Sequence, residues 1–333
     1  MSWNSVGSGR WKGEYPTPPP LLKDGSYDAY RTYTGILSFM RFPYSRDLEG
    51  VDVVVSGIPF DNAVTYRPGA RLGPRAVRAG SVQMVGLKPF PFGFEVKDYL
   101  KVIDYGDCEL NTHLSRTVTG DITDHIRLIT SEGALPLSLG GDHFVTYPIL
   151  RAIAEKHGPV ALVHFDAHCD TWPDEDPEEL HHGSMFLRAK NEGLIDVEHS
   201  VQVGLRTYNE EDHGFEILSA PWVHREGTAA TIQAILDRVG DSKAYLTFDI
   251  DCLDPAYAPG TGTPVAGGLT PAQAFEIFYN LGSINFVGMD VVEVAPAYDH
   301  AEITAINGAS LAQIFLCLIA EKKGAKRKIV GRV

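Results

Sequence analysis

The fold is indicated first by the segment Val160-Ala-Leu-Val-His-Phe-Asp-Ala-His-Cys-Asp170, in which a short apolar run ends in acidic residues. A near-continuous run of this kind is typical of a strand that is buried on both faces of a parallel sheet. The segment Ala244-Tyr-Leu-Thr-Phe-Asp-Ile-Asp251 repeats the arrangement, and Leu139-Gly-Gly-Asp-His143 adds a histidine after a third apolar run. The three segments therefore predict polar side chains at the carboxyl ends of three strands.

Apolar runs alternate with helix-forming segments along most of the chain. We expect strands at Val51–Pro59, Leu100–Asp104, Leu135–Leu139, Val160–Phe165, Ser200–Leu205, Ala220–His224, Ala244–Ile250 and Ile284–Val292. We expect helices at Pro74–Gln83, Ser115–Glu132, Thr146–Lys156, Met185–Glu192, Thr228–Val239, Pro271–Leu281 and Ala309–Lys323. This alternation predicts a doubly wound α/β fold with a parallel sheet and right-handed crossovers. In such folds, ligands bind beyond the carboxyl ends of the strands.

Composition restricts the class of protein. The 333 residues are 44% hydrophobic and carry a formal net charge of −14, which disfavours nucleic acids and anionic membrane surfaces as partners. We see no apolar stretch that approaches the roughly 20 residues needed to span a bilayer. The four cysteines form no C-x-x-C pair, which favours a cytoplasmic protein. We predict an extended, Pro-rich arm at residues 1–30, a single domain at 31–325 and a tail at 326–333.

Six side chains at the predicted strand ends form a candidate metal site. They are His143, Asp166, His168, Asp170, Asp249 and Asp251. Because residues two apart on a strand point to one face, we expect those within each segment to converge. Four carboxylates buried together require cations, and an oxygen-rich ligand set favours two Mn²⁺ ions, with Ni²⁺, Co²⁺ or Fe²⁺ as alternatives. We interpret Asp254 as a turn cap and His164 as a core histidine.

These motifs resemble those of the ureohydrolases, the family of arginase and agmatinase. The resemblance extends from about Tyr33 to Lys322 and is most specific in three segments: Gly140–His143, Asp166–Asp170 and Phe248–Pro264. The segments Gly183–Phe186 and Gly288–Tyr298 are most similar to those of bacterial agmatinases. The resemblance implies a three-layer α/β/α sandwich around an eight-stranded, mainly parallel sheet. It also implies two Mn²⁺ ions and a homo-oligomer of three or six subunits.

The resemblance also implies a role for each site residue. One metal would be held by His143, Asp166, Asp170 and Asp249, and the other by Asp166, His168, Asp249 and Asp251. Asp166 and Asp249 would bridge the two ions. His182 lies where the family has a proton shuttle, with His181 as an alternative, and Glu293 lies where a carboxylate receives the guanidinium group. Thr263 would contact the substrate, and Asp170 would belong to the catalytic residues as well as to the metal ligands.

The resemblance implies hydrolysis of a small cationic guanidino compound to urea and an amine, with agmatine as the expected substrate and putrescine as the amine. The loop Trp172–His182 carries five acidic residues and is expected to line the mouth of the site, where it would favour a cationic substrate. Guanidinobutyrate, guanidine and a substituted guanidine such as a biguanide are alternative substrates. Alternative functions are a binuclear amide hydrolase, which would not need Glu293, and an inactive regulatory paralogue in a heteromer.

Overall fold

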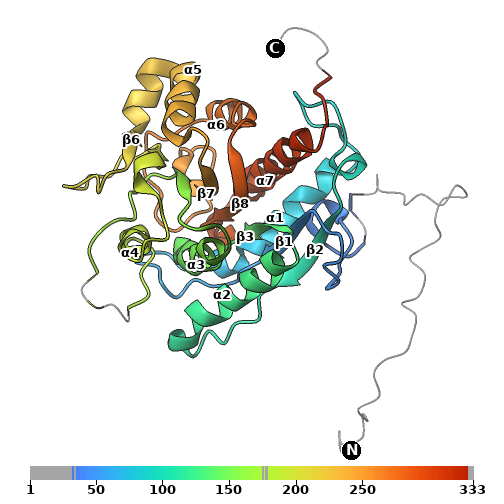
Figure 1. The fold of residues 1–333 in the computed structure, drawn as a ribbon, viewed down its shortest axis with the longest axis horizontal. Helices are drawn as coiled ribbons and strands as arrows, with labels where there is room; N and C mark the ends of the chain where they lie inside the picture. Colours follow the sequence, from blue (N-terminus) through green and yellow to red (C-terminus); the bar gives the residue numbers. More distant parts are fainter. Residues whose placement is uncertain (1–31, 34, 175, 177–178, 329–333) are drawn as a thin grey trace, which may run out of the picture.

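The computed structural model describes residues 32–33, 35–174, 176 and 179–328. Its eight strands form one parallel sheet in the order β2-β1-β3-β8-β7-β4-β5-β6 (Figure 1). The strands are β1 (Val53–Gly57), β2 (Val102–Asp107), β3 (Leu135–Leu139), β4 (Ala161–Phe165), β5 (Val201–Val203), β6 (Glu216–Leu218), β7 (Lys243–Asp249) and β8 (Asn285–Val292). The predicted arm at residues 1–30 and residues 329–333 of the predicted tail lie outside the described residues.

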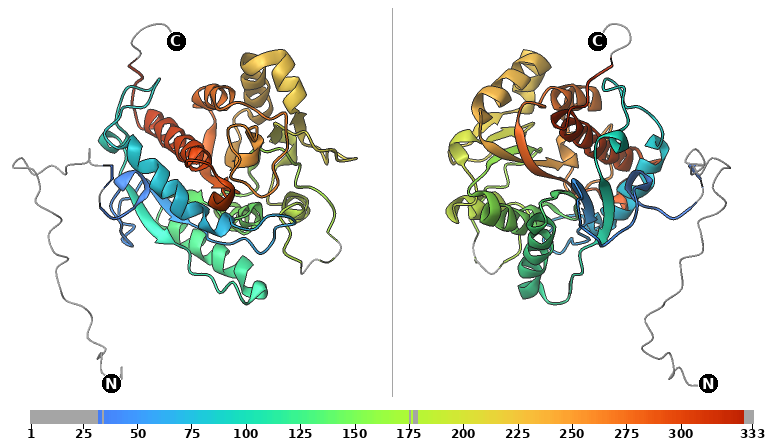
Figure 2. Two further views of the ribbon diagram at one scale, coloured as in Figure 1. Left: turned by 180° about the vertical axis from the view of Figure 1, so that it is seen from behind. Right: turned by 45° about the vertical axis from the view of Figure 1, so that its right-hand side comes forward.

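Helices cover both faces of the sheet. They are α1 (Gly73–Ser81), α2 (Ser115–Ser131), α3 (Thr146–His157), α4 (Met185–Asn191), α5 (Ala220–Val239), α6 (Pro271–Tyr279) and α7 (Ile303–Lys322). Helices α1, α5, α6 and α7 pack together on one face, and α2, α3 and α4 pack on the other (Figures 1 and 2). The predicted three-layer α/β/α sandwich is confirmed.

Alternate residues of each strand supply the two halves of the core. In β1, Val53 and Val55 face the layer of α1 and α7, whereas Val54 faces the layer of α2 and α3. All five residues of β1 are buried. Burial on both faces explains why these strands are apolar runs without the alternation of polar residues seen in half-exposed strands.

The predicted strand at Ala220–His224 is wrong, because these residues form the first turn of α5. The Ser219 hydroxyl accepts a hydrogen bond from the backbone N–H of Trp222, and Pro221 lies in the first turn, where its missing N–H costs nothing. The eighth strand is instead β6, which has only three residues. Helix α5 bends at Gly227, whose φ of 85° interrupts the helical backbone.

Helix α7 is longer than predicted, since it begins at Ile303 and not at Ala309. Its 20 residues are long and apolar enough to cross a membrane, contrary to our expectation that the chain has no such stretch. However, most of the helix is buried within the molecule, where it packs against α1 and α6. Its apolar composition is therefore that of a central core helix.

The four central strands, β3, β8, β7 and β4, end at the same edge of the sheet. His143 lies in a short 3₁₀ turn just after β3, and Asp166 directly follows β4. Asp249 is the last residue of β7, and Glu293 directly follows β8. Parallel strands thus bring four candidate site residues together from segments up to 150 residues apart in sequence.

Candidate metal and substrate site

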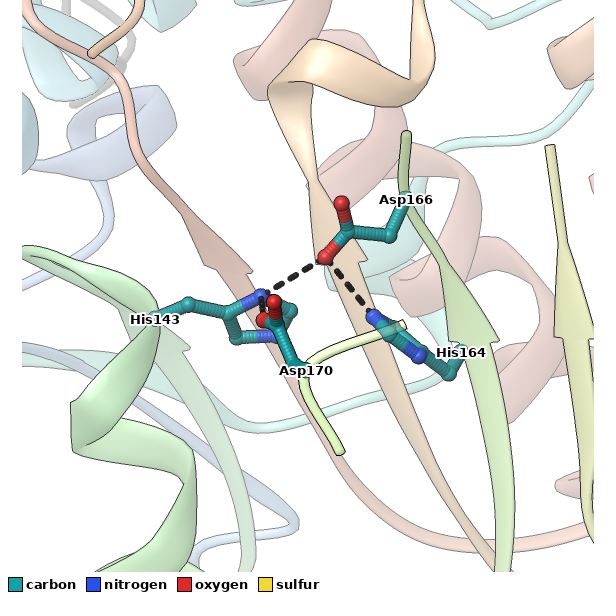
Figure 3. A group of neighbouring side chains, drawn as sticks. All are labelled: His143, His164, Asp166 and Asp170. Atoms are coloured by element: carbon teal, nitrogen blue, oxygen red, sulfur yellow. Dashed lines mark hydrogen bonds and ion pairs between the residues drawn. The ribbon is translucent and has the colours of Figure 1, made fainter. Parts of the chain in front are cut away.

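The first group of candidate ligands surrounds the Nδ1 atom of His143. This atom lies 2.9 Å from Asp170 Oδ2, 3.0 Å from Asp166 Oδ2 and 3.2 Å from Asp249 Oδ2. All four side chains are buried. Figure 3 shows His143, Asp166 and Asp170 pointing toward one another, with His164 on the far side of Asp166.

The second group surrounds the Nδ1 atom of His168. This atom lies 3.1 Å from Asp251 Oδ2 and 3.3 Å from Asp166 Oδ1. Asp166 therefore directs one carboxylate oxygen to each histidine, which is the arrangement of a bridging ligand. The other oxygen of Asp249, Oδ1, accepts the backbone N–H of Asp251 at 2.8 Å. The structure thus brings together all six residues that the sequence singled out.

These ligands converge for a different reason from the one we predicted. Strand β4 ends before Asp166, and β7 ends at Asp249, so alternation along an extended strand does not align the later residues. A 3₁₀ turn that Asp249 caps carries Asp251 back toward the site. Asp170 has a φ of 53°, a left-handed conformation that is uncommon for a residue with a side chain. Tight turns after the strands, and not the strands themselves, close the ligand set.

The electrostatics of the cluster fit divalent cations. Burial, and then the neighbouring charges of Asp251 and Asp166, raise the pKa of Asp249 well above its usual value. Burial opposes the charged form of His168, but Asp251 and Asp166 raise its pKa to about 12. The buried carboxylates therefore need positive charge beside them to remain ionised. Two divalent cations supply such charge, and the oxygen and imidazole donors suit them.

Two further predictions concern residues beside the ligands. His164 is buried, as expected of a core histidine, and both ring nitrogens have partners: Nε2 lies 2.8 Å from Asp166 Oδ2, and Nδ1 lies 3.0 Å from Gln202 Nε2. It therefore touches a candidate ligand, which the sequence did not indicate. Asp254 accepts three backbone N–H groups from its own turn and from the loop at 267–268, so the prediction of a turn cap is confirmed.

Glu293 is the buried carboxylate next to the first ligand group. Its Oε1 accepts the backbone N–H of His143 at 2.8 Å and lies 2.9 Å from Nδ1 of His182. Its Oε2 is also buried and has no hydrogen-bond partner in the described part of the chain. A carboxylate oxygen without a partner in a buried position is costly unless a ligand supplies the donor.

His182 has different partners at its two nitrogens. Nε2 accepts the backbone N–H of Thr65 at 3.1 Å and lies 2.9 Å from the Thr65 hydroxyl oxygen. Because a backbone N–H can only donate, this contact places the ring proton on Nδ1, which donates it to Glu293. Burial opposes the charged ring, but Glu293 raises the pKa of His182 to about 9. The Glu293 carboxylate thus favours the protonated ring, whereas the Thr65 backbone N–H requires an unprotonated Nε2.

One of the five acidic residues of the loop, Asp174, is already paired with a cation of the chain. The carboxylate of Asp174 is bound by Arg188, with two N–O distances of 2.7 and 3.0 Å. Glu175 and Glu178 lie outside the described residues. The ring of Trp172 is tilted by 59° to that of His168, with 6.3 Å between the ring centroids, so this part of the loop does approach the site.

Several polar residues of the site were not identified from the sequence. Asp142, Thr247 and Asp290 are buried, and Thr65 is exposed. Asp142 accepts the backbone N–H of Ala63, and its other oxygen is buried without a partner among the described residues. A polar residue inside an otherwise apolar strand could have marked Thr247 and Asp290, but no local pattern marks Thr65, which contacts a histidine 117 positions away.

The comparisons with known proteins agree with this geometry. The family model described as "Arginase family" matches residues 51–317. A curated agmatinase from Chromobacterium violaceum is 60% identical over 295 residues, which make up 88% of this chain and 92% of that protein. A crystal structure described as a hypothetical agmatinase from Burkholderia thailandensis has 58% identity and a TM-score of 0.87, covering 88% of this chain and 93% of that one. The proclavaminate amidino hydrolase of Streptomyces clavuligerus has 37% identity and a TM-score of 0.82, covering 87% and 98%.

Proposed function

This chain belongs to the arginase family of ureohydrolases, and we propose that it hydrolyses the guanidinium group of agmatine to release urea and putrescine. The observation that supports this most directly is the buried carboxylate of Glu293, which has one satisfied and one unsatisfied oxygen beside a cluster of metal ligands. A guanidinium group supplies the planar N–H donors that such an oxygen lacks. A simple amide hydrolase would have no use for this charge.

Glu293 orients the substrate in this proposal. Its Oε1 is fixed by His143 and His182, so the carboxylate cannot rotate freely, and Oε2 is left for the substrate. A fixed carboxylate holds the guanidinium plane and its central carbon in one position, which lowers the entropic cost of reaction. Gly262 borders this position, because a Cβ atom added to it would lie 3.3 Å from Oε2.

His182 moves the proton that the departing amine needs. The neutral ring carries its proton at Nδ1 toward Glu293, and it gains or loses a proton at Nε2, where Thr65 lies. Glu293 raises the pKa of His182 to about 9, so near neutral pH the ring favours the protonated form that can supply this proton.

The six ligands would hold two divalent cations, and we propose Mn²⁺ for the oxygen-rich donor set. When bound, two such ions polarise the substrate and activate water at neutral pH. His143 and Asp170 would serve one ion and His168 and Asp251 the other, with Asp166 and, as the resemblance implies, Asp249 shared by both. Thr263 lies 3.3 Å from Asp251 through its hydroxyl, which supports its role at the substrate end of the cluster.

We further propose a cytoplasmic enzyme, which its four free and buried cysteines support. We also propose a homo-oligomer of three or six subunits on the resemblance to ureohydrolases alone. Light scattering of the purified protein tests that number.

A urea-release assay across a panel of guanidines tests the proposed substrate. The protein is reconstituted with Mn²⁺ and, separately, with Ni²⁺, and is then supplied with agmatine, guanidinobutyrate, arginine, guanidine and a biguanide. We expect the highest kcat/KM with agmatine. A higher value with another guanidine would replace the substrate but keep the reaction, whereas metal-loaded protein that releases no urea from any of them would contradict the reaction itself.

A further inference from the structure

A row of polar side chains crosses the apolar sheet beneath the metal ligands. Strand pairing aligns one residue from each of six neighbouring strands, and all six are almost completely buried: Ser56, Ser138, Asp290, Thr247, His164 and Gln202. The row that precedes it by one residue is entirely apolar: Val55, Leu137, Met289, Leu246, Val163 and Val201. Sheet pairing does not require polar residues here, and burying them costs free energy.

The middle of this polar row is hydrogen-bonded to the ligand His143. Asp290 receives three hydroxyl donors: Thr247 at 2.6 Å on Oδ1, and Thr146 and Tyr245, each at 2.9 Å, on Oδ2. Because the Thr247 proton is directed to the carboxylate, the Thr247 oxygen accepts the proton of His143 Nε2 at 2.8 Å. The His143 ring is thereby fixed with Nδ1, its other nitrogen, facing the three aspartates of the cluster.

The other end of the row is hydrogen-bonded to the ligand Asp166. The amide nitrogen of Gln202 donates to the carbonyl of Cys169 at 2.7 Å, which fixes the orientation of the amide, and it also donates to Nδ1 of His164 at 3.0 Å. His164 therefore carries its proton on Nε2 and donates it to Asp166 Oδ2 at 2.8 Å. His164 is thus a donor to a ligand and is not itself a ligand.

We infer that this polar row is a positioning frame for the metal site, in which Asp290 and Thr247 set the tautomer of His143 while Gln202 and His164 orient Asp166. The inference deepens the proposed function and rests on it. Partners of this kind hold a ligand in its binding geometry, and their loss typically weakens metal affinity about 10-fold to 100-fold. Ser56 and Ser138 belong to the same row but have no hydrogen-bond partner among the described residues, so the inference assigns them no such role.

The critical variant is Asp290→Asn, which keeps the shape of the side chain. Its amide can donate to Thr247, which reverses the Thr247 hydroxyl so that it donates to Nε2 of His143. The His143 proton then moves to Nδ1 and blocks the ligand atom, as an amide substitution of this kind does when it enforces the wrong histidine tautomer. We expect one of the two metal equivalents to bind about 10-fold to 100-fold more weakly, measured by Mn²⁺ titration against a competing chelator.

Four other variants separate positioning from folding. Thr247→Val should weaken the same metal equivalent, and Thr247→Ser should restore it, because serine keeps the hydroxyl. Gln202→Met should weaken metal binding through the contact of His164 with Asp166, without altering Asp290. Ser138→Ala is the matched control from the same row, and it should leave both dissociation constants unchanged.

The outcomes distinguish this inference from the proposed function. If the unaltered protein binds no divalent cation, the proposed metal site is wrong and this inference falls with it. If the unaltered protein binds two equivalents and the folded Asp290→Asn and Gln202→Met variants bind both with unchanged affinity, only this inference is overturned. An equal loss of affinity in Ser138→Ala would also overturn it, because it would show an effect of packing in the row.

Discussion

Replacing Glu293 by glutamine should abolish most of the activity without disturbing the fold or the metal ligands. Oε1 of Glu293 accepts from the His143 backbone and from His182, and a glutamine Oε1 in the same position keeps both contacts. Only Oε2 changes, from a partnerless carboxylate oxygen to an N–H donor that faces the donors of a guanidinium group. Loss of one partner of a buried charge pair costs about 2–5 kcal/mol. At about 1.4 kcal/mol per tenfold change, kcat/KM should fall by roughly 30-fold to 5,000-fold.

The assay is urea release from agmatine by Mn²⁺-loaded protein, with metal content measured by mass spectrometry. The matched control is Glu302→Gln, because Glu302 is exposed at the start of α7 and has nearly the same backbone conformation, with φ of 61° compared with 62° for Glu293. The control should retain full activity. A loss smaller than tenfold in Glu293→Gln, with two metals bound and the control intact, would refute the assignment of Glu293 as the guanidinium receptor.

Three further substitutions test other parts of the site. Asp249→Asn should abolish turnover and one metal equivalent, since the carboxylate lies 3.2 Å from His143 Nδ1, and a fully active variant would refute that ligand. His182→Ala should lower kcat by about 10²–10⁴ with both metals retained, whereas loss of metal would identify a ligand instead. Gly262→Ala places a methyl group 3.3 Å from Glu293 Oε2 and 3.0 Å from the Arg67 carbonyl oxygen, so kcat/KM should fall about tenfold or more at unchanged metal content. An unchanged KM and kcat there would mean that the guanidinium group binds elsewhere.

The sequence predicted the architecture well where strands are long apolar runs, because burial on both faces makes composition sufficient. It failed at α5, where Trp222 and Val223 favour a strand by composition. The competing Ser219-Ala-Pro221 start of a helix prevails, because it satisfies the first free N–H groups. The three-residue β6 is too short to produce a recognisable run. Edge elements of this kind depend on tertiary contacts more than on local composition.

The candidate metal ligands were identifiable because they lie directly after three apolar strands. The contacts of Thr65 with His182, and of Asp290 through Thr247 with His143, were not identifiable, because they are made across the fold. The pairing of Asp174 with Arg188 was missed for a related reason, because the sequence does not reveal which cation a carboxylate contacts. Position along a strand is a local property, whereas the partner of a charge is not.

Asp170 and Glu293 share a left-handed backbone conformation, which directs a carboxylate of the site in each case. If β8 continued in an extended conformation, Glu293 would share the face of Val291, which packs toward α7 and away from His143. Its φ of 62° turns the chain at the end of the strand, and its carboxylate reaches the His143 amide instead. Such a conformation costs about 1–3 kcal/mol and persists only when the surroundings enforce it. Asp170 and Glu293 both carry this cost, so backbone strain accompanies the orientation of two carboxylates of the site. Substitution by glycine at 170 or 293 would relieve the strain, but it would also remove the carboxylate and, with it, the function.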